Sequence, residues 1–554
     1  MRSRETKMSK RRVTRREFLK AAALAGAGLA TAAAPTSLLG SAAPTPAAGQ
    51  PRKGGVARWW YRAEPASYDP HQHRHAMLFG VSGLVFSNLV RNTWLDAYAV
   101  KPDLAESWET SPDAKMFTFH LRKGVKWHDG KPFTAEDVKY SLEKMADPRR
   151  APEVATLFTA LERVAVVDSY AVTAYLKRPQ HSFLNFLTAG MAKILPKHIA
   201  DANVDNKDRK FLVGTGPFRF KEHVRGVSNE VERNPEYYFA GLPYLDGVKI
   251  FQIADPTARA AAVCANRLDM AHPVIGIGTF EELEQLKACL PTGVYNFYPN
   301  GMPLVLIFNL RGNAAPWHDQ RVRRAVSLVV DRDAMVKAGY GSPQMAQVGG
   351  FFALTNEVGL PIGEIEKFYG RDKPYADRVA EAKRLMADAG YANGFAVAMR
   401  VRAAHAQYKR MVEMVITQVA EIGIRATARE AVDAEHFERE RKGDFEWSTD
   451  IISCVLGLPD ESLGWVRSNT SVNLSGYSNP EVDTLYDQLG AATKEKRVEL
   501  SRNIERLALK DAPYIIYAQP TFGLVWWPYV KGLDGPPGNQ YPCMQNVDKM
   551  WLDK

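Results

Sequence analysis

Helical and strand patterns alternate between about residue 302 and residue 510. Residues 395–401 alternate apolar and less apolar side chains, as in a strand, and an apolar stripe at helical spacing over 411–422 ends at Gly423. Ile424 to Ala428 is typical of a second strand. The order strand, helix, strand at these lengths predicts a parallel crossover, in which ligands lie beyond the carboxyl ends of the strands. Arg402 and His405 fall at that position.

Shorter patterns complete the outline. We predict one helix after Asp319 and another over 377–389 with Gly390 as its stop. In the first half, residues 117–122 alternate as a half-buried strand, and Asp129-Gly130 suits a tight hairpin turn. Thr134 then predicts the start of a helix. Both halves of the chain are therefore expected to be α/β.

The net charge of +10 is concentrated at the beginning of the 554-residue chain. Residues 1–20 carry nine basic and two acidic side chains, so the other 534 residues have a net charge of only +3. A nearly neutral body gives no support for nucleic acid as a partner.

The basic head is followed by an Ala- and Gly-rich stretch over 21–39 and by small residues up to Ala43. This order predicts a removable export signal over 1–43 and a Pro- and Ala-rich linker over 44–53. Residues 14–20 match the twin-arginine export motif, through Arg15, Arg16, Phe18 and Leu19. Because no Cys lies near the expected cut, we expect a soluble, periplasmic protein without a lipid anchor.

Motifs of catalysis are missing from the chain. It has no G-x-S-x-G, H-E-x-x-H, Walker or intact G-x-G-x-x-G sequence, so we expect neither an enzyme nor a cofactor. His71, His73 and His75 alternate as metal ligands on a strand could, but Arg74 opposes a cation and we expect no metal there. A polar loop whose first histidine, His71, lines a cleft is the preferred interpretation.

Cysteines and aromatic pairs leave alternatives open. The four cysteines allow three pairings, Cys264 with Cys289 among them, and the spacing does not decide between disulfides and buried thiols. Trp59-Trp60-Tyr61 and Trp526-Trp527 suit either a stacking surface for a ligand or the core.

Two long segments carry a family resemblance. Residues 101–108, KPDLAESW, and 117–138, FTFHLRKGVKWHDGKPFTAEDV, closely resemble the signature of family 5 extracellular solute-binding proteins. The resemblance continues through residues 68–71, 214–218, 321–325, 331–332 and 477–483, so it spans nearly the whole mature chain.

The resemblance implies a two-lobed α/β clamshell, the type II periplasmic-binding-protein fold of a large, cluster C-like kind. It implies a first lobe of residues 54–94, 213–301 and 511–554, an extra subdomain of 95–212 in that lobe, and a second lobe of 302–510. The chain would cross between the lobes near Met302 and near Asp511.

The same resemblance implies the function. The protein would capture a small solute between its lobes by hinge closure and deliver it, as a monomer, to an ABC permease and ATPase complex at the inner membrane. The candidate ligand-binding residues are Trp60, Tyr61, His71, Asn309, Arg402, His405 and Asp460. The alternatives are an exported enzyme on this scaffold and a sensory binding protein that reports to a receptor.

The resemblance also bears on the solute. Peptide-binding members place an Asp, which pairs with the peptide's amino terminus, just ahead of an Asp-Pro-Asp-like segment; here Val455 falls near that position. Asp460 is the alternative acidic group, unless it only caps the following helix, and Asp450 is less favoured. We therefore expect a small polar non-peptide solute, such as an opine, an amino-acid derivative or a sugar.

Overall fold

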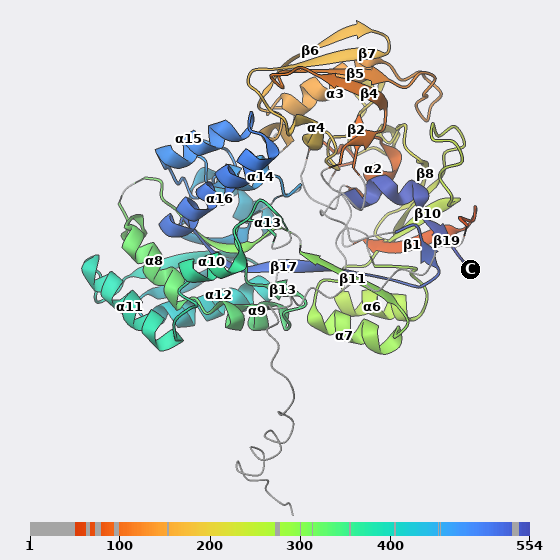
Figure 1. The fold of residues 1–554 in the computed structure, drawn as a ribbon. Coiled ribbons are helices and arrows are strands. Elements are labelled where there is room, and N and C mark those ends of the chain that lie inside the picture. Colours follow the sequence, from red (N-terminus) through yellow and green to blue (C-terminus); the bar gives the residue numbers. More distant parts are fainter. Residues whose placement is uncertain are drawn as a thin grey trace, which may run out of the picture. The chain divides into compact units, whose positions relative to one another are not determined.

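The computed structural model consists of several β-sheets with helices packed on them (Figure 1). The described residues are 50–61, 67–72, 79–92, 99–151, 154–271, 277–299, 301–312, 314–353, 356–403, 406–452, 454, 456–533 and 542–554. Its mixed sheets and helices form an α/β two-lobed fold, as the sequence predicts. The predicted signal and linker up to residue 49 lie outside the described part.

A seven-stranded mixed sheet contains the strands of the predicted second lobe, residues 302–510, together with β11 and β17. Its strand order is β11-β17-β12-β16-β14-β15, and β13 pairs with β17. The strands are β11 (Val294–Pro299), β12 (Leu304–Phe308), β13 (Ala346–Gln347), β14 (Ala396–Arg402), β15 (Arg425–Ala431), β16 (Trp447–Ile451) and β17 (Tyr514–Trp526).

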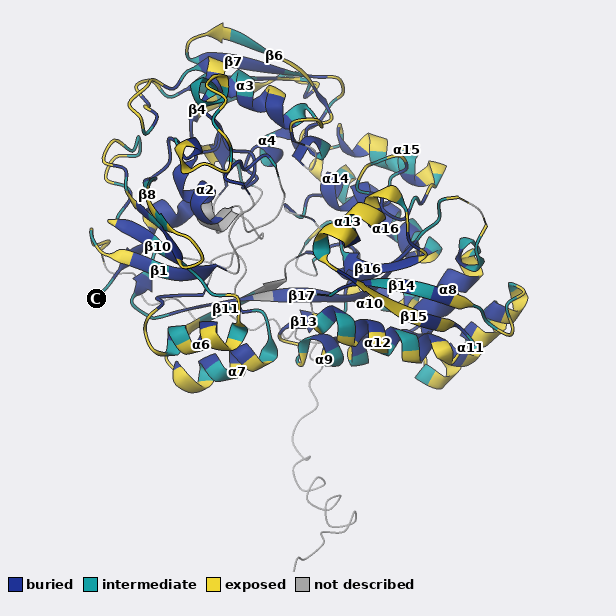
Figure 2. Cartoon of the chain, turned by 180° about the vertical axis from the view of Figure 1, so that it is seen from behind, coloured by how far each residue is buried: buried dark blue, intermediate teal, exposed yellow. Residues whose placement is uncertain are grey.

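Apolar clusters cover both faces of this sheet. All five residues of β12 are buried, and they alternate: Leu304, Leu306 and Phe308 belong to one cluster, and Val305 and Ile307 belong to another. Burial on both faces explains why β12 is apolar throughout. In Figure 2, β16 and most of β17 are buried, whereas the outer faces of the helices are exposed.

Helices pack on each face. The first cluster receives α8 (Gln320–Val329), α9 (Arg332–Tyr340), α11 (Tyr375–Asp388) and α12 (Ala406–Ala420). The second receives α10 (Ile362–Phe368), η5 (Leu463–Trp465), α15 (Pro480–Leu489) and α16 (Lys494–Asp511), and α14 (Pro459–Ser462) packs on η5 and α15. The helices predicted after Asp319 and over 377–389 are thus confirmed as α8 and α11.

The predicted crossover is confirmed. Strands β14 and β15 are parallel, α12 connects them, and α12 packs on both. Two glycines close the turns at one end of this unit: a Cβ on Gly394 would lie 1.8 Å from the carbonyl oxygen of Gly423, and both residues have positive φ. Only glycine fits at these two positions.

Strand β17 belongs to two neighbourhoods. Its first part, Tyr514–Ala518, pairs with β12, and its second part, Thr521–Trp526, pairs with β11. Both pairings are antiparallel. Strand β17 therefore joins β11 and β12 in one sheet. The lobe boundaries near Met302 and Asp511 stay predictions.

The first lobe has a four-stranded sheet of order β1-β10-β9-β8. Its strands are β1 (Val56–Tyr61), β8 (Phe218–Val224), β9 (Ser228–Arg233) and β10 (Gly247–Gln252), and its helices are α2 (Phe79–Val85), α6 (Pro256–Cys264) and α7 (Phe280–Cys289). A disulfide joins Cys264 to Cys289 at the ends of α6 and α7, whereas Cys454 is buried as a thiol. One of the pairings that the sequence left open is therefore formed.

A fully antiparallel sheet, of order β4-β5-β7-β6, lies in the predicted extra subdomain. Its strands are β4 (Ala105–Thr110), β5 (Met116–Leu121), β6 (Leu161–Asp168) and β7 (Ala171–Leu176). The Asp129-Gly130 turn does not extend β5 into a hairpin; it closes a small bridge between Lys126 and Pro132. Helix α3 (Ala135–Ala146) begins after Thr134, whose backbone N–H donates to Asp137 at 3.0 Å.

Short elements connect these units. They are β2 (Val90–Arg91), β3 (Lys101–Pro102), η2 (Val154–Thr156), α4 (Phe183–Phe186), α5 (Lys197–Asp201), η3 (Arg209–Phe211), η4 (Pro316–His318), α13 (Asp433–Lys442), β18 (Val530–Lys531), η6 (Pro542–Lys549) and β19 (Trp551–Leu552). Among the described helices, none is both long and apolar enough to cross a membrane.

Candidate functional site

Polar side chains meet near the carboxyl ends of β14 and β16. These two strands are parallel neighbours, β14 ends at Arg402, and β16 carries Asp450 one residue before its end. Helix α13, which follows β15, packs on β14 and contributes the remaining side chains. The group, here called the α13 cluster, consists of Arg402, Asp433, His436, Glu440 and Asp450. This edge of the sheet is where α/β folds place their ligands.

Arg402 makes the outer part of the cluster. Its guanidinium donates to both carboxylate oxygens of Asp433, at 3.0 and 2.7 Å, and more weakly to Asp450 at 3.4 Å. Arg402 is buried, whereas 41% of the Asp433 side chain is exposed. Burial alone would lower the pKa of Arg402, but the carboxylates of Asp433 and Asp450 outweigh it and raise that pKa. Arg402 is therefore a fixed positive charge close to solvent.

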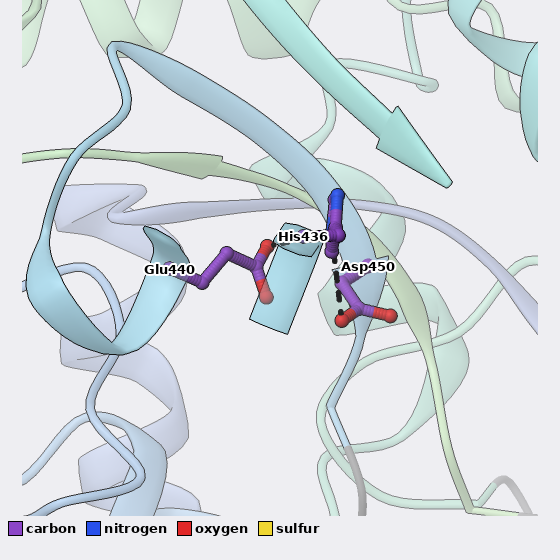
Figure 3. Close-up of side chains that lie close together, drawn as sticks. All are labelled: His436, Glu440 and Asp450. Carbon is purple, nitrogen blue, oxygen red and sulfur yellow. Dashed lines mark ion pairs between the residues drawn. The ribbon is translucent and has the colours of Figure 1, made fainter. Parts of the chain in front are cut away.

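The inner part of the cluster, His436, Glu440 and Asp450, is buried. Figure 3 shows these three side chains close together. The Nε2 atom of His436 lies 3.1 Å from Glu440 Oε1 and 3.8 Å from Asp450 Oδ2. The hydroxyl of Ser448 donates to Glu440 Oε1 at 2.6 Å, and Asp450 Oδ1 accepts from the backbone N–H of Ile451. Burial and then Glu440 raise the pKa of Asp450 to about 6. Burial lowers the pKa of His436, but Glu440 and Asp450 raise it by more.

The predicted ligand-binding residues of the first lobe lie in packed surroundings. Trp60 is fully buried under the guanidinium of Arg259, 4.1 Å from the ring centre, and Tyr61 belongs to the main apolar cluster. His71 is also buried; its Nε2 donates to the carbonyl oxygen of Lys193 at 2.8 Å, and burial lowers its pKa to about 4. These contacts support a packing role, and solute contact by the three residues stays a prediction.

The predicted residues of the second lobe are also engaged. The Asn309 amide donates to the carbonyl oxygens of Gly443 and Phe445, at 2.9 and 2.7 Å. Asp460 accepts from the guanidinium of Arg497 at 2.6 Å. His405, His73 and His75 lie outside the described residues. Among the predicted residues, Arg402 alone lies in the α13 cluster.

Sequence reasoning missed His436, Glu440 and Asp433. A signal was present: His436 and Glu440 stand four apart, which places them on one face of a helix. Asp450 also interrupts a short strand that is otherwise suited to burial. What the sequence could not supply is the packing of α13 beside β16, which brings these positions together.

Comparison with known proteins identifies the family. The model of bacterial extracellular solute-binding proteins, family 5 Middle, matches residues 99–473, which is well over half of the chain. The chain belongs to family 5 of the bacterial extracellular solute-binding proteins. This family 5 protein is therefore an extracellular solute-binding protein, and the resemblance seen in the sequence is confirmed.

Individual relatives differ in what they bind. Heme-binding protein A of Haemophilus influenzae is 29% identical over 468 residues, covering 78% of this family 5 chain and 81% of its own. The glutathione-binding protein GsiB of Pectobacterium atrosepticum is 27% identical over 430 residues, covering 75% and 79%. Both are named as binding proteins, not as enzymes.

Solved structures show the same fold. The periplasmic binding protein DppA of Helicobacter pylori, in complex with the peptide STSA, has a TM-score of 0.76 at 24% identity and covers 91% of this chain and 99% of its own. AgaA of A. tumefaciens R10, in complex with agropinic acid, has a TM-score of 0.73 at 23% identity and covers 90% and 99%. The family 5 fold therefore extends over nearly all of the chain.

Proposed function

We propose that this protein captures a small polar solute that lacks a free ammonium group and hands it to an ABC permease and ATPase complex at the inner membrane. Opines, other amino-acid derivatives and sugars are the chemical classes that fit. The solute would lie between the lobes, which close around it, and the protein would act as a monomer. No step of this function requires a catalytic residue or a cofactor.

The proposed solute class rests on one observation: the acidic side chains of Asp450 and Asp460 each already pair with a basic side chain of the protein. Residues 451–459, between Asp450 and Asp460, contain no Asp or Glu. Asp460 is paired with Arg497, and Asp450 lies in the α13 cluster beside Arg402 and His436. Leu456 and Leu458 are buried in the main apolar cluster. The amino terminus of a peptide, buried beside residues 451–459 without a carboxylate partner, would cost several kcal/mol, which disfavours peptides as solutes.

Relatives are consistent with a non-peptide solute but do not choose it. AgaA was solved with agropinic acid and DppA with a peptide, so the same fold holds both kinds of ligand. The choice between them therefore rests on the residues of this chain.

A binding screen tests the solute class. The mature protein, freed of copurified ligand by unfolding and refolding, is titrated calorimetrically with mixed di- and tripeptides and with a set of opines, acylated amino acids and sugars. We expect no heat from the peptides and binding by at least one compound of the other set. Sub-micromolar binding of an ordinary dipeptide would refute the proposed solute class.

Arg402 is the residue that we propose for anchoring a solute carboxylate. Its partner Asp433 is the exposed member of the pair, so a solute carboxylate could take its place with the same bidentate geometry. Arg402→Lys keeps the charge and loses the fork. We expect it to weaken an anionic ligand at least tenfold, whereas Arg400→Lys, two residues earlier on β14, leaves the affinity unchanged. Equal affinity in both variants would remove Arg402 from the site.

Export by the twin-arginine pathway is part of the proposal. It is supported by the match of residues 14–20 to the motif and by the apolar stretch behind it. The pathway reads both guanidinium groups, which Lys does not mimic. Fractionation of cells that carry Arg15→Lys with Arg16→Lys should show precursor in the cytoplasm, and normal accumulation of mature protein in the periplasm would refute the pathway.

A further inference from the structure

The inner part of the α13 cluster has an unbalanced charge. Arg402 and Asp433 form a bidentate pair that is neutral as a unit. Glu440 and Asp450 remain, two buried carboxylates that face a single imidazole. With neutral His436 and ionised carboxylates the inner group carries two negative charges, which are costly to bury without a compensating cation.

The donor atoms converge on one point. One ligand atom each from His436, Glu440 and Asp450 lie within 4.8 Å of one another. Ligands about 2.0–2.1 Å from a tetrahedral zinc ion are about 3.3 Å apart, and the distances of 3.1 and 3.8 Å from His436 Nε2 to the carboxylate oxygens bracket that value. The three side chains are at most 5% exposed, so they form an enclosed set.

His436 Nε2 and Glu440 Oε2, two buried atoms of this set, have no hydrogen-bond partner. Despite its distance of 3.1 Å from Glu440, His436 Nε2 is not aligned as a hydrogen-bond donor, and the buried Glu440 Oε2 also lacks a hydrogen-bond partner. Buried polar atoms without partners are rare and call for an explanation. Contacts from outside the set hold both carboxylates: the Ser448 hydroxyl donates to Glu440 Oε1, the oxygen 3.1 Å from His436, and the backbone N–H of Ile451 donates to Asp450 Oδ1, the oxygen turned away from His436.

We propose that His436, Glu440 and Asp450 bind one divalent transition-metal ion, with Zn²⁺ as the best fit. One imidazole and two carboxylates suit zinc, a divalent charge neutralises the inner group, and a fourth position is left for water or Ser448. Arg402 touches the far oxygen of Asp450 and stays paired with Asp433, so it does not occupy the position of the ion. This site does not depend on the proposed solute or on transport.

Titration with Zn²⁺ alone tests the site. The untagged mature protein is stripped with a chelator, dialysed and titrated calorimetrically. We expect one equivalent to bind with a Kd of about 1 μM or below, and binding to weaken about a hundredfold or more in His436→Gln and in Glu440→Gln. The matched control is His120→Gln, which alters an exposed histidine 3.5 Å from Glu109 and should leave zinc affinity unchanged.

X-ray absorption keeps the test decisive if the variants fail to fold. Wild-type protein with one equivalent of Zn²⁺ should show one imidazole nitrogen and two or three oxygens at about 2.0–2.1 Å and no sulfur. Failure to saturate below about 100 μM Zn²⁺, undiminished affinity in folded His436→Gln, or a sulfur ligand would overturn the proposal. If Zn²⁺ fails to saturate the protein, a proton on His436 is the compensating positive charge instead.

Discussion

At the scale of single residues, burial decides whether a side chain packs against the protein or is open to a ligand. Trp60, Tyr61 and His71 were chosen from the sequence as aromatic or polar groups suited to a ligand, and each is buried against named protein partners. A sequence pattern places a side chain on one face of a strand but does not say whether solvent or another layer covers that face. For this reason the α13 cluster, assembled from three elements, was predicted only through Arg402, with Asp450 as a less favoured candidate.

The pairing of Asp460 with Arg497 predicts a structural role. Both side chains are nearly buried, and the guanidinium lies 2.6 Å from the carboxylate. Asp460→Asn leaves the arginine charge without its partner, so we expect the free energy of unfolding to fall by about 3 kcal/mol in urea denaturation. Asp487→Asn breaks the exposed pair with Arg467 and should cost less than about 1 kcal/mol. Unchanged stability in Asp460→Asn with lost solute affinity would make Asp460 a ligand-binding residue instead.

Glu505 predicts a pH dependence of stability. Burial raises its pKa to about 7 from the ordinary 4.5, although the backbone N–H groups of Leu360 and Phe351 donate to it and lower the pKa in part. Because the folded pKa is the higher one, the stability from this group is present below about pH 4.5 and is lost as the pH rises through about 7. The loss is on the order of 3 kcal/mol.

Denaturation at pH 5 and pH 8 measures this effect. Wild type should lose stability between the two pH values relative to Glu505→Gln, which has no proton to release. Glu499→Gln, on the exposed side of the same helix, serves as the control and should follow wild type. The same pH slope in wild type and Glu505→Gln would show that Glu505 titrates normally.

Among the elements, the sequence predicted best those whose structure depends on residues close together in the chain. The strand–helix–strand unit over 395–428 and the Thr134 helix start were foreseen because apolar spacing and capping are set by neighbouring residues. The tight turn expected at Asp129-Gly130 forms between the bridged residues Lys126 and Pro132, but it does not pair β5 with the following segment, because β5 takes β4 and β7 as its neighbours. Partner choice between strands depends on residues far away in the chain, which periodicity does not report.

Glycines in one family segment have a steric reason. A Cβ on Gly214 would lie 1.8 Å from the carbonyl oxygen of Val85 at the end of α2, and the N–H of Gly216 donates to that oxygen at 2.8 Å. The segment therefore joins α2 to the chain before β8 at backbone distance. Close backbone packing against α2 therefore explains the two glycines in residues 214–218, one of the segments that resemble the family.

The disulfide between α6 and α7 predicts a measurable stabilisation. It closes a separation of 25 residues, for which loop closure corresponds to about 3 kcal/mol. We expect the double variant Cys264→Ser with Cys289→Ser to lose that amount in urea denaturation. Reductant should lower the stability of wild type to the level of the variant and leave the variant unchanged. An effect of reductant on the variant would point to other sulfur chemistry.

At the scale of the whole molecule, closure of the lobes is the main prediction. Closure around a solute requires that the bound state be more compact, because binding energy selects the closed arrangement. Small-angle scattering should show a lower radius of gyration at saturation with a solute found by the screen, and no change with a compound that does not bind. An unchanged curve with saturating solute would contradict a clamshell mechanism.

The shared strand β17 has a consequence for the order in which the protein is made. Because it pairs with β12 through Tyr514–Ala518 and with β11 through Thr521–Trp526, β11 has no described strand beside it, and β12 has only β16, until the ribosome has added more than 500 residues. At about 5–20 residues per second, β12 waits at least several seconds for Tyr514 to be synthesised. The central sheet is therefore completed only late in translation, after the helices that cover it have been synthesised.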